Sequence, residues 1–336
     1  MESHFAFLTS PGPLPDAIAS GMRAQISQSL RAVPQNICPL LPLLTDSHCH
    51  ILGVGLTEAS LAESMSNELA RVGRAKQYLF QTVRVDDWNV IIERAWVCGV
   101  DDAKIRLGFG VHPRWAQEVL PDGTEFGQKL ADCLSKMPSA IVGEIGLDRT
   151  NRFKSFFETH QIPIFREQLG IAASFSRPVS IHCVKADAAL VQIFQDCTSG
   201  NSDGLPPTIC LHSFGGSFET LERIISIVEG NHSETHGEKV VRVFVGLNAW
   251  TNLYKKGART FIRRLVLGTP FGGTRMLIES DYDFPDYPGS HPWDADKILL
   301  NGVLTLSEML DWDPAVVALR IEENTRAFLR TLPLDP

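Results

Sequence analysis

The chain alternates apolar, strand-like runs with segments of helical spacing, and this alternation restricts the fold more than any other feature. Strands are predicted at 43–50, 77–83, 105–111, 140–145, 179–183, 208–212, 240–246 and 276–279. Between them, helices are predicted at 61–72, 88–98, 126–137, 162–175, 190–197, 219–228 and 255–267. Eight strands, most followed by a helix, indicate the α/β class and a parallel sheet closed into a (β/α)8 TIM barrel. An open, doubly wound sheet has the same alternation and stays an alternative.

The domain organisation follows from the position of the first strand. Pro42 marks its start, because proline has no N–H to donate inside a central ladder. We therefore predict an N-terminal extension over residues 1–40, with one helix near 18–30, and a single TIM-barrel domain over residues 41–330. Segments 198–207 and 230–239 are polar and are predicted to be loop insertions rather than domain linkers.

Composition excludes some classes of partner and compartment. The formal net charge is −8, so a nucleic-acid partner would need a local basic patch or a bound metal. No apolar run approaches the roughly 20 residues of a membrane span, and the first residues lack the pattern of a secretory signal. The seven cysteines have no paired spacing, which fits a reducing compartment. We expect an intracellular protein of the cytoplasm, the nucleus or both, without a membrane partner.

The first strand ends in Asp46-x-His48-x-His50. Residues two apart in a strand point to the same face, so these three side chains are expected to converge. Two imidazoles at one strand end can ligate a divalent cation, and a nearby carboxylate can serve as a further ligand or fix the imidazole tautomer. The motif therefore predicts a metal site at this strand end.

Later strands also end in side chains that ligate metals. They are His112 after the third strand, Glu144 in the fourth, His182 in the fifth, His212 in the sixth and Asp281 after the last. TIM-barrel enzymes place catalysis at the C-terminal ends of their strands, so these groups should face one mouth. A lone histidine at a strand end is more often structural, but a buried carboxylate between apolar, glycine-flanked neighbours needs a partner or a cation. The set as a whole favours a site for two ions that share Glu144.

The order of these motifs resembles the TatD family of metal-dependent deoxyribonucleases. The similar segments are Asp46-Ser47-His48-Cys49-His50, Gly110-Val111-His112-Pro113, Gly143-Glu144-Ile145-Gly146-Leu147-Asp148, Pro178-Val179-Ser180-Ile181-His182, His212-Ser213-Phe214-Gly215-Gly216 and Glu279-Ser280-Asp281, together with residues 165–169 and 324–328. The resemblance covers about residues 43–329. It extends to a fungal branch of the family that is named for association with a subunit of the anaphase-promoting complex.

The resemblance implies a barrel of the amidohydrolase type that holds two divalent ions, zinc, magnesium or manganese. It implies hydrolysis of DNA phosphodiester bonds through activated water, acting as an exonuclease on single-stranded or frayed duplex ends. At the matching positions, His48, His50 and Asp281 would hold one ion, His182 and His212 the other, and Glu144 would bridge them. Glu144, Asp281 and His112 would be the catalytic residues. Asp281 could accept the proton of the water, and His112 would lie in the substrate mouth.

The chain departs from the family pattern around the substrate. Val184 stands where the family usually has arginine, with Lys185 beside it, and Asp283 stands where proline is common. We predict substrate contacts from His112, Arg149, Arg152, Lys154 and Lys185, because they follow the strands that carry Glu144 and His182 or lie at the mouth. The second basic run, at 255–264, is predicted to be mostly a solvated helix face.

Two other functions remain open at this point. The same dimetal site could hydrolyse an amide, a lactone or an ester, and dependence of activity on Arg149 and Lys154 would favour a phosphate substrate instead. Alternatively, the barrel could keep its metals and act mainly as a protein-interaction partner, through the N-terminal extension or the loop insertions. Binding that survives Glu144→Gln, without measurable hydrolysis, would support that second alternative.

Overall fold

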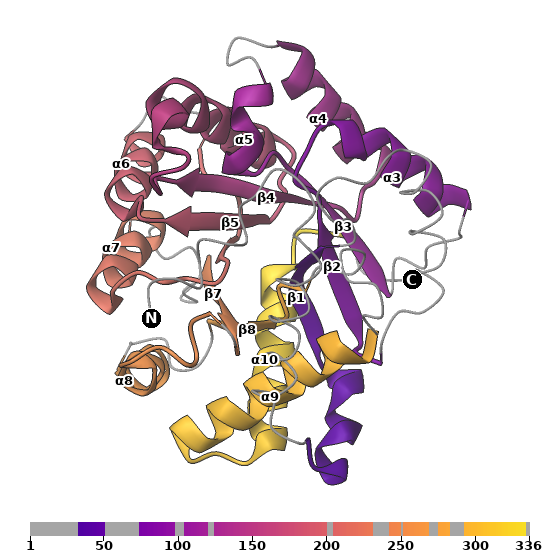
Figure 1. Ribbon diagram of the computed structural model, residues 1–336, viewed down its shortest axis with the longest axis vertical. Helices are drawn as coiled ribbons and strands as arrows, with labels where there is room; N and C mark the ends of the chain where they lie inside the picture. The colour runs from indigo at the N-terminus through magenta and orange to yellow at the C-terminus, as the bar shows by residue number, and fades with distance from the viewer. Residues whose placement is uncertain are drawn as a thin grey trace, which may run out of the picture.

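The computed structural model describes residues 33–50, 74–97, 104–119, 124–199, 204–230, 242–249, 251–268, 275–282 and 292–333. At its centre is one parallel sheet of eight strands (Figure 1). The strands are β1 (Thr45–His50), β2 (Gln77–Gln81), β3 (Ile105–Phe109), β4 (Ile141–Asp148), β5 (Val179–Val184), β6 (Ile209–Leu211), β7 (Val243–Asn248) and β8 (Met276–Glu279). They lie in unbroken chain order, each parallel to the next. The predicted barrel is confirmed, and the doubly wound alternative is wrong because that fold reverses its strand order.

Hydrogen bonds at the mouth bring the last strand back to the first. The N–H of Asp281 donates to the carbonyl oxygen of His48 at 2.9 Å, and the N–H of His50 donates to the carbonyl oxygen of Tyr282 at 2.8 Å. Lower down, Ser47 Oγ donates to the carbonyl oxygen of Ile278 at 2.9 Å. The barrel is therefore nearly closed, and its seam lies beside the predicted ligands of β1.

Helices surround the sheet (Figure 1). They are α3 (Asp86–Val97), α4 (Thr124–Lys136), α5 (Ile162–Ser174), α6 (Asp187–Thr198), α7 (Phe218–Glu229), α8 (Ala258–Arg263), α9 (Pro292–Leu310) and α10 (Pro314–Phe328). Five of the predicted helices match within three residues at each end, whereas the one predicted at 255–267 is divided into α8 and a π-helical turn, η5 (Arg264–Gly268). Helix α9 was not predicted. The helices predicted near 18–30 and at 61–72, and most of the two loop insertions, lie outside the described residues.

Residues ahead of β1 form a 3-10 helix, η1 (Gln35–Leu43), where the sequence predicted the strand to begin at residue 43. Pro39 and Pro42 lie inside this helix, and Ile37 and Leu41 are buried as it packs against α9 and α10. Among the described helices, none combines the length and the apolar character that crossing a membrane would require.

The lower half of the barrel interior is apolar. Leu79, Ile141, Cys210, Phe244 and Leu277 come from different strands and form one buried cluster with Phe328 of α10. The Phe244 and Phe328 rings pack edge to face, with centroids 5.7 Å apart. Two positions further along several of the same strands, the side chains become polar, as with Gln81 after Leu79 and Glu279 after Leu277. The apolar cluster thus forms the floor on which a polar site is built.

Candidate metal centre

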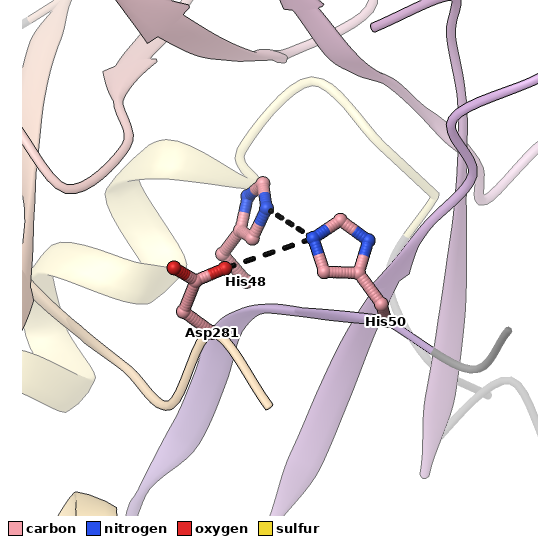
Figure 2. A group of neighbouring side chains, drawn as sticks. All are labelled: His48, His50 and Asp281. Atoms are coloured by element: carbon pink, nitrogen blue, oxygen red, sulfur yellow. Dashed lines mark hydrogen bonds and ion pairs between the residues drawn. The ribbon is translucent and has the colours of Figure 1, made fainter. Parts of the chain in front are cut away.

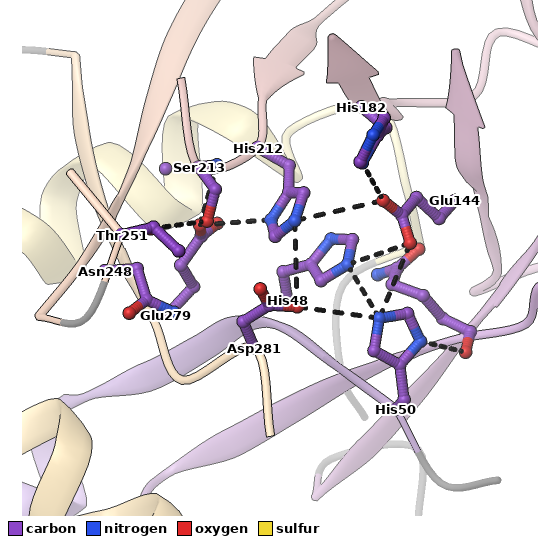
Figure 3. Close-up of polar contacts among 12 residues, drawn as sticks. His48, His50, Glu144, His182, His212, Ser213, Asn248, Thr251, Glu279 and Asp281 are labelled. Atoms are coloured by element: carbon purple, nitrogen blue, oxygen red, sulfur yellow. Dashed lines mark hydrogen bonds and ion pairs between the residues drawn. The ribbon is translucent and has the colours of Figure 1, made fainter. Parts of the chain in front are cut away.

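The C-terminal ends of the strands bring every predicted metal ligand to one place. His48 and His50 come from β1, Glu144 from β4 and His182 from β5. His212 directly follows β6, and Asp281 and His112 lie in the segments just after β8 and β3. Figure 2 shows His48, His50 and Asp281 facing one another, and Figure 3 adds Glu144, His182 and His212. The arrangement follows from the barrel, because parallel strands deliver their last side chains to the same rim.

Glu144 lies at the middle of this group. Its Oε2 atom is 3.5 Å from His48 Nε2 and 3.4 Å from His50 Nε2. Its Oε1 atom is 3.0 Å from His182 Nδ1 and 3.8 Å from His212 Nε2. The same Oε1 atom is also 3.6 Å from His112 Nε2. The two carboxylate oxygens therefore face different sets of imidazoles, as a bridging carboxylate needs.

The glycines beside Glu144 let β4 approach its neighbours closely. A Cβ at Gly143 would lie 2.3 Å from Gln81 Oε1, and one at Gly146 would lie 2.0 Å from the carbonyl oxygen of His182. Gly146 also has a φ of 141°, which other residues rarely adopt. A side chain at Gly143 would displace the side chain of Gln81, and one at Gly146 would push β4 away from β5 and separate Glu144 from His182.

His50 shows why the group suits a cation. Its Nδ1 lies 3.1 Å from the carbonyl oxygen of Gln81, which can only accept, so Nδ1 carries the hydrogen. In the neutral ring, Nε2 then presents a lone pair to Asp281 Oδ1 at 3.6 Å and to Glu144 Oε2. His48 Nε2 is 3.3 Å from the same nitrogen, while its Nδ1 contacts Ser180 Oγ at 2.8 Å. Electron-pair donors that converge in this way fit a divalent ion bound by His48, His50 and Asp281.

Two carboxylates behind the ligands went unassigned in the sequence analysis. Glu279 Oε1 lies 3.0 Å from His212 Nδ1 and accepts hydrogen bonds from the N–H and the hydroxyl of Ser213, both at 2.8 Å. Asp148 Oδ2 lies 3.7 Å from His182 Nε2. A carboxylate behind a ligating imidazole orients the ring and increases its basicity. The signal for Glu279 was present in the sequence, since it is a second buried carboxylate in an apolar strand.

Asp46 has a different role from the one predicted. It does not join the imidazoles but accepts hydrogen bonds from the N–H of Ser280 at 2.9 Å, the hydroxyl of Ser280 at 2.5 Å and the N–H of His48 at 3.3 Å. The pairing of β1 with β2 is irregular between Asp46 and Cys49, so simple strand alternation does not hold there. Burial raises the pKa of Asp46 to about 7. Asp46 therefore ties β1 to the residue after β8.

The electrostatics of the metal-free cluster divide the histidines into two classes. Burial lowers the pKa of His182 and of His212, but nearby carboxylates outweigh it and raise these pKa values to about 10 and about 9. For His112, burial prevails and lowers the pKa to about 3, and burial also lowers the pKa of His48. Burial raises the pKa of Glu144, yet the surrounding imidazoles hold it well below its usual range. Protons on two histidines thus balance the carboxylates where a cation is absent.

His112 differs from the other histidines in its tautomer. Its Nδ1 accepts a hydrogen bond from the N–H of Arg114 at 3.0 Å, so in the neutral ring the hydrogen is on Nε2. That Nε2 lies 3.6 Å from Glu144 Oε1. His112 is thus close enough to complete a third possible ligand group with Glu144 and His182, but its tautomer favours a hydrogen-bond donor at the mouth.

The residues predicted to contact substrate make mostly local contacts. The guanidinium groups of Arg149 and Arg152 lie over the rings of Phe157 and Phe153, at 5.4 and 5.5 Å from the ring centroids. Lys154 Nζ donates to Asn151 Oδ1 at 3.3 Å. Lys185 is exposed and follows β5 with a φ of 54°. Val184 is partly buried at the end of β5, and Asp283 lies outside the described residues.

Comparison with known proteins gives the family. The family model for TatD related DNase matches residues 45–330. An uncharacterized deoxyribonuclease of Saccharomyces cerevisiae is 25% identical over 338 residues, covering 85% of this chain and 99% of its own length. The Cut9-interacting protein scn1 of Schizosaccharomyces pombe is 25% identical over 63% of this chain and 69% of its own. A 3'-5' ssDNA/RNA exonuclease TatD of Edwardsiella piscicida is 27% identical over 51% of this chain and 55% of its own.

Solved structures agree on the fold. A TatD homologue from Escherichia coli superposes with a TM-score of 0.58 at 19% identity, covering 87% of this chain and 98% of that chain. A TatD family hydrolase from Entamoeba histolytica gives a TM-score of 0.57 at 15% identity, covering 84% and 96%. With the family model matching nearly the whole described barrel, the chain belongs to the TatD-related DNase family of hydrolases.

Proposed function

We propose that this protein is a divalent-metal-dependent exonuclease that hydrolyses DNA phosphodiester bonds at single-stranded or frayed ends. The observation that carries the proposal is Glu144, which turns one carboxylate oxygen to His48 and His50 and the other to His182, His212 and His112. The names of the relatives support this substrate class, since one is called a deoxyribonuclease and another a 3'-5' ssDNA/RNA exonuclease.

His48, His50 and Asp281 would hold one ion, and these three side chains lie within ligand distance of one another. We assign the other ion to His182 and His212, with Glu144 as the bridge, because both histidines face the same Glu144 oxygen. In the protein without ions, His182 groups with His112 and His212 groups with His48, each around Glu144. Bound divalent ions would neutralise phosphate charge and make a water nucleophilic at neutral pH. Zinc, magnesium and manganese are the candidates.

Two side chains can handle protons at the reacting phosphate. Asp281 is partly exposed at the mouth and its pKa is lowered, because the imidazoles led by His212 outweigh burial, so it can accept a proton from the attacking water. His112 can donate through Nε2 to a phosphate oxygen. Glu279 and Asp148 keep the rings of His212 and His182 oriented for ligation.

The test is cleavage of end-labelled single-stranded DNA by metal-stripped protein that is resupplied with magnesium, manganese or zinc. We expect metal-dependent laddering, whose direction shows which end is attacked, and no laddering by Glu144→Gln. Glu322→Gln, on α10 and paired with Lys76, is the matched control and should cleave normally. No cleavage with any ion, in protein that holds two metals by elemental analysis, would overturn the DNA substrate and leave the metal site standing.

A role as a protein-interaction partner is the second candidate. Its support is the name of the Schizosaccharomyces pombe relative, a Cut9-interacting protein, together with Val184 at a position where a charged substrate contact was expected. Glu144→Gln separates the two functions, because loss of the metals removes hydrolysis and leaves the outer surface intact. Partner capture that depends on Glu144 would count against a separate binding function.

A further inference from the structure

A cavity of about 200 Å³ lies beside the metal centre, between the segments that follow β6 and β7. We call it the β6–β7 pocket. Its lining includes Gly215, Gly216, Asn252, Lys255, Lys256 and Phe261. One wall begins two residues after His212, and both segments leave the C-terminal ends of their strands. The pocket therefore opens at the same end of the barrel as the metal centre.

Hydrogen bonds fix this pocket relative to the metal centre. Thr251 Oγ1 donates to Ser213 Oγ at 3.0 Å, and Ser213 Oγ donates to Glu279 Oε1 at 2.8 Å (Figure 3). On the other side, Asn252 Nδ2 donates to the carbonyl oxygen of Gly246 at 2.7 Å. The same Glu279 oxygen faces His212. These hydrogen bonds therefore connect the walls of the pocket to a predicted metal ligand.

Lys255 is the cation of this pocket. Its Nζ lies 2.7 Å from the position that a Cβ on Gly215 would occupy, so it sits directly over that glycine. Much of the side chain is exposed, yet partial desolvation of the ammonium lowers its pKa. No carboxylate in the described part of the chain forms an ion pair with it. A partly desolvated ammonium without a counter-charge is a binding group for an anion.

The arginines of the same basic run are engaged elsewhere. Arg264 pairs with Glu219 at 2.6 Å and lies over the Phe218 ring at 4.0 Å. Arg259 and Arg263 donate to the carbonyl oxygens of Glu308 and Met309 in α9. The run that was predicted to be a solvated face thus has two parts: arginines that pack against neighbouring helices, and lysines that line the pocket.

The glycines define the size and sign of the ligand. Among the described residues, the only atom over Gly215 is Lys255 Nζ, whereas the Phe214 ring covers Gly216. Helix α7 begins just after these glycines, so the positive end of its dipole is near the pocket. A Cβ on Gly216 would lie 2.9 Å from Asp187 Oδ1, so a carboxylate borders that side. An anion is therefore favoured at Gly215, below Lys255, and disfavoured at Gly216. A single phosphate group fits these limits.

We propose that the β6–β7 pocket binds a phosphate of the DNA strand next to the one being hydrolysed, with Lys255 as its main contact. This inference rests on the proposed nuclease function, because it takes the strand at the metal centre to continue into the pocket. Lys255 then determines the preference for a polynucleotide over a small phosphodiester, and it takes no part in the bond-breaking step.

The experiment compares Lys255→Gln with wild type on two substrates, single-stranded DNA and bis(p-nitrophenyl) phosphate, which has no second phosphate. We expect KM for DNA to rise about tenfold at unchanged kcat. The slope of log KM against log salt concentration should decrease by about the amount that one phosphate contact contributes. Hydrolysis of the small substrate should keep its wild-type kcat and KM. Lys255→Arg should recover most of the loss. Arg259→Gln, on the same run but outside the pocket, is the matched control.

The outcomes separate the pocket from the nuclease. Wild-type KM and salt dependence on DNA for Lys255→Gln, or equal losses on both substrates, would overturn the pocket and leave the nuclease standing. If wild type cleaves neither substrate, the nuclease proposal fails, and anisotropy of labelled single-stranded DNA with Glu144→Gln and with Glu144→Gln/Lys255→Gln decides the pocket. Weaker binding by the double variant supports the phosphate contact, and equal binding removes it.

Discussion

The two ends of this barrel both bury charged side chains, but they balance them in opposite ways. At the N-terminal end, Arg275 donates from both terminal nitrogens to Glu229, each at 2.7 Å. The same carboxylate accepts the N–H groups of Arg242 and Val243 at 2.9 and 3.0 Å. At the mouth, five histidines surround Glu144 and Asp281, and the separations are mostly 3.3–3.8 Å.

The difference teaches how a structural charge can be distinguished from a functional one. Around Glu229, each carboxylate oxygen has a donor, so the charges stabilise one another and need nothing from outside. Around Glu144, electron-pair donors converge on one another, and balance comes only from protons or a cation. Burial alone does not separate the two ends, because Glu229 and Glu144 are both buried. What distinguishes the two ends is where the lone pairs point: toward hydrogen-bond donors at Glu229, and toward other lone pairs at Glu144.

The largest effect should come from Glu144→Gln. We expect hydrolysis to fall by about a thousandfold or more, equivalent to roughly 4 kcal/mol of transition-state stabilisation, because both ions lose their shared ligand. The metal-stripped variant should still fold but melt below stripped wild type, because protonated His182 and His212 lose one of their carboxylates. Initial rates, elemental analysis and thermal melts measure the three quantities. Wild-type turnover would rule out the bridging role.

The reverse pattern is expected for Glu229→Gln at the opposite end. Removing one partner of a buried ion pair leaves Arg275 uncompensated, which should cost about 3 kcal/mol of unfolding free energy. Activity per folded molecule should be unchanged, since this pair lies at the far end of the barrel from the metal centre. Urea titration followed by rates at matched folded fractions tests both statements. A loss of specific activity without a loss of stability would break the comparison.

The pH dependence of the stripped protein should arise at the mouth. The pKa values of His182 and His212, about 10 and about 9, lie above the ordinary value of 6.5. Each therefore contributes stability that is complete below pH 6.5 and is lost as the pH rises through its folded-state pKa. Thermal melts from pH 6 to 10 should show this decline in stripped protein and little of it after metal loading, which replaces the protons. A flat profile for stripped protein would contradict the assignment.

The smallest effect is expected for Glu279→Gln, which keeps the shape of the side chain behind His212. We expect metal affinity to fall about tenfold, because an amide orients the imidazole but does not increase its basicity. A competition titration with a chelating dye measures this directly. Glu322→Gln, on α10 and paired with Lys76, supplies the control and should leave metal affinity within twofold.

Much of the fold and site could be predicted because both depend on local patterns. Alternation of elements gives the barrel, and the same-face rule places His48 beside His50. Asp46 escaped the rule because β1 is irregular after it. The role of Glu279 depends on its register with His212 on another strand, which sequence spacing does not encode. Helix α9 follows the last strand, where the alternation has no next strand to frame it.

Long-range partners explain the remaining differences. The basic run after β7 has five cations of similar appearance, and their different roles come from α7 and α9, which supply the acceptors for three arginines. Lys255 differs from these arginines because it forms no ion pair among the described residues and lies over Gly215. The different roles of the lysine and the arginines depend on where α7 and α9 lie, and the spacing of residues in the sequence does not give those positions.

The seam between β8 and β1 has a consequence for how the protein opens. The backbone hydrogen bonds that close the barrel belong to the predicted ligands themselves, His48, His50 and Asp281. An ion that holds their side chains together therefore also holds the two ends of the sheet together. Amide hydrogen exchange at His50 and Asp281 should slow on metal loading more than exchange at central strands such as β4. The seam would then act as the region through which ion binding is coupled to the local opening of the barrel.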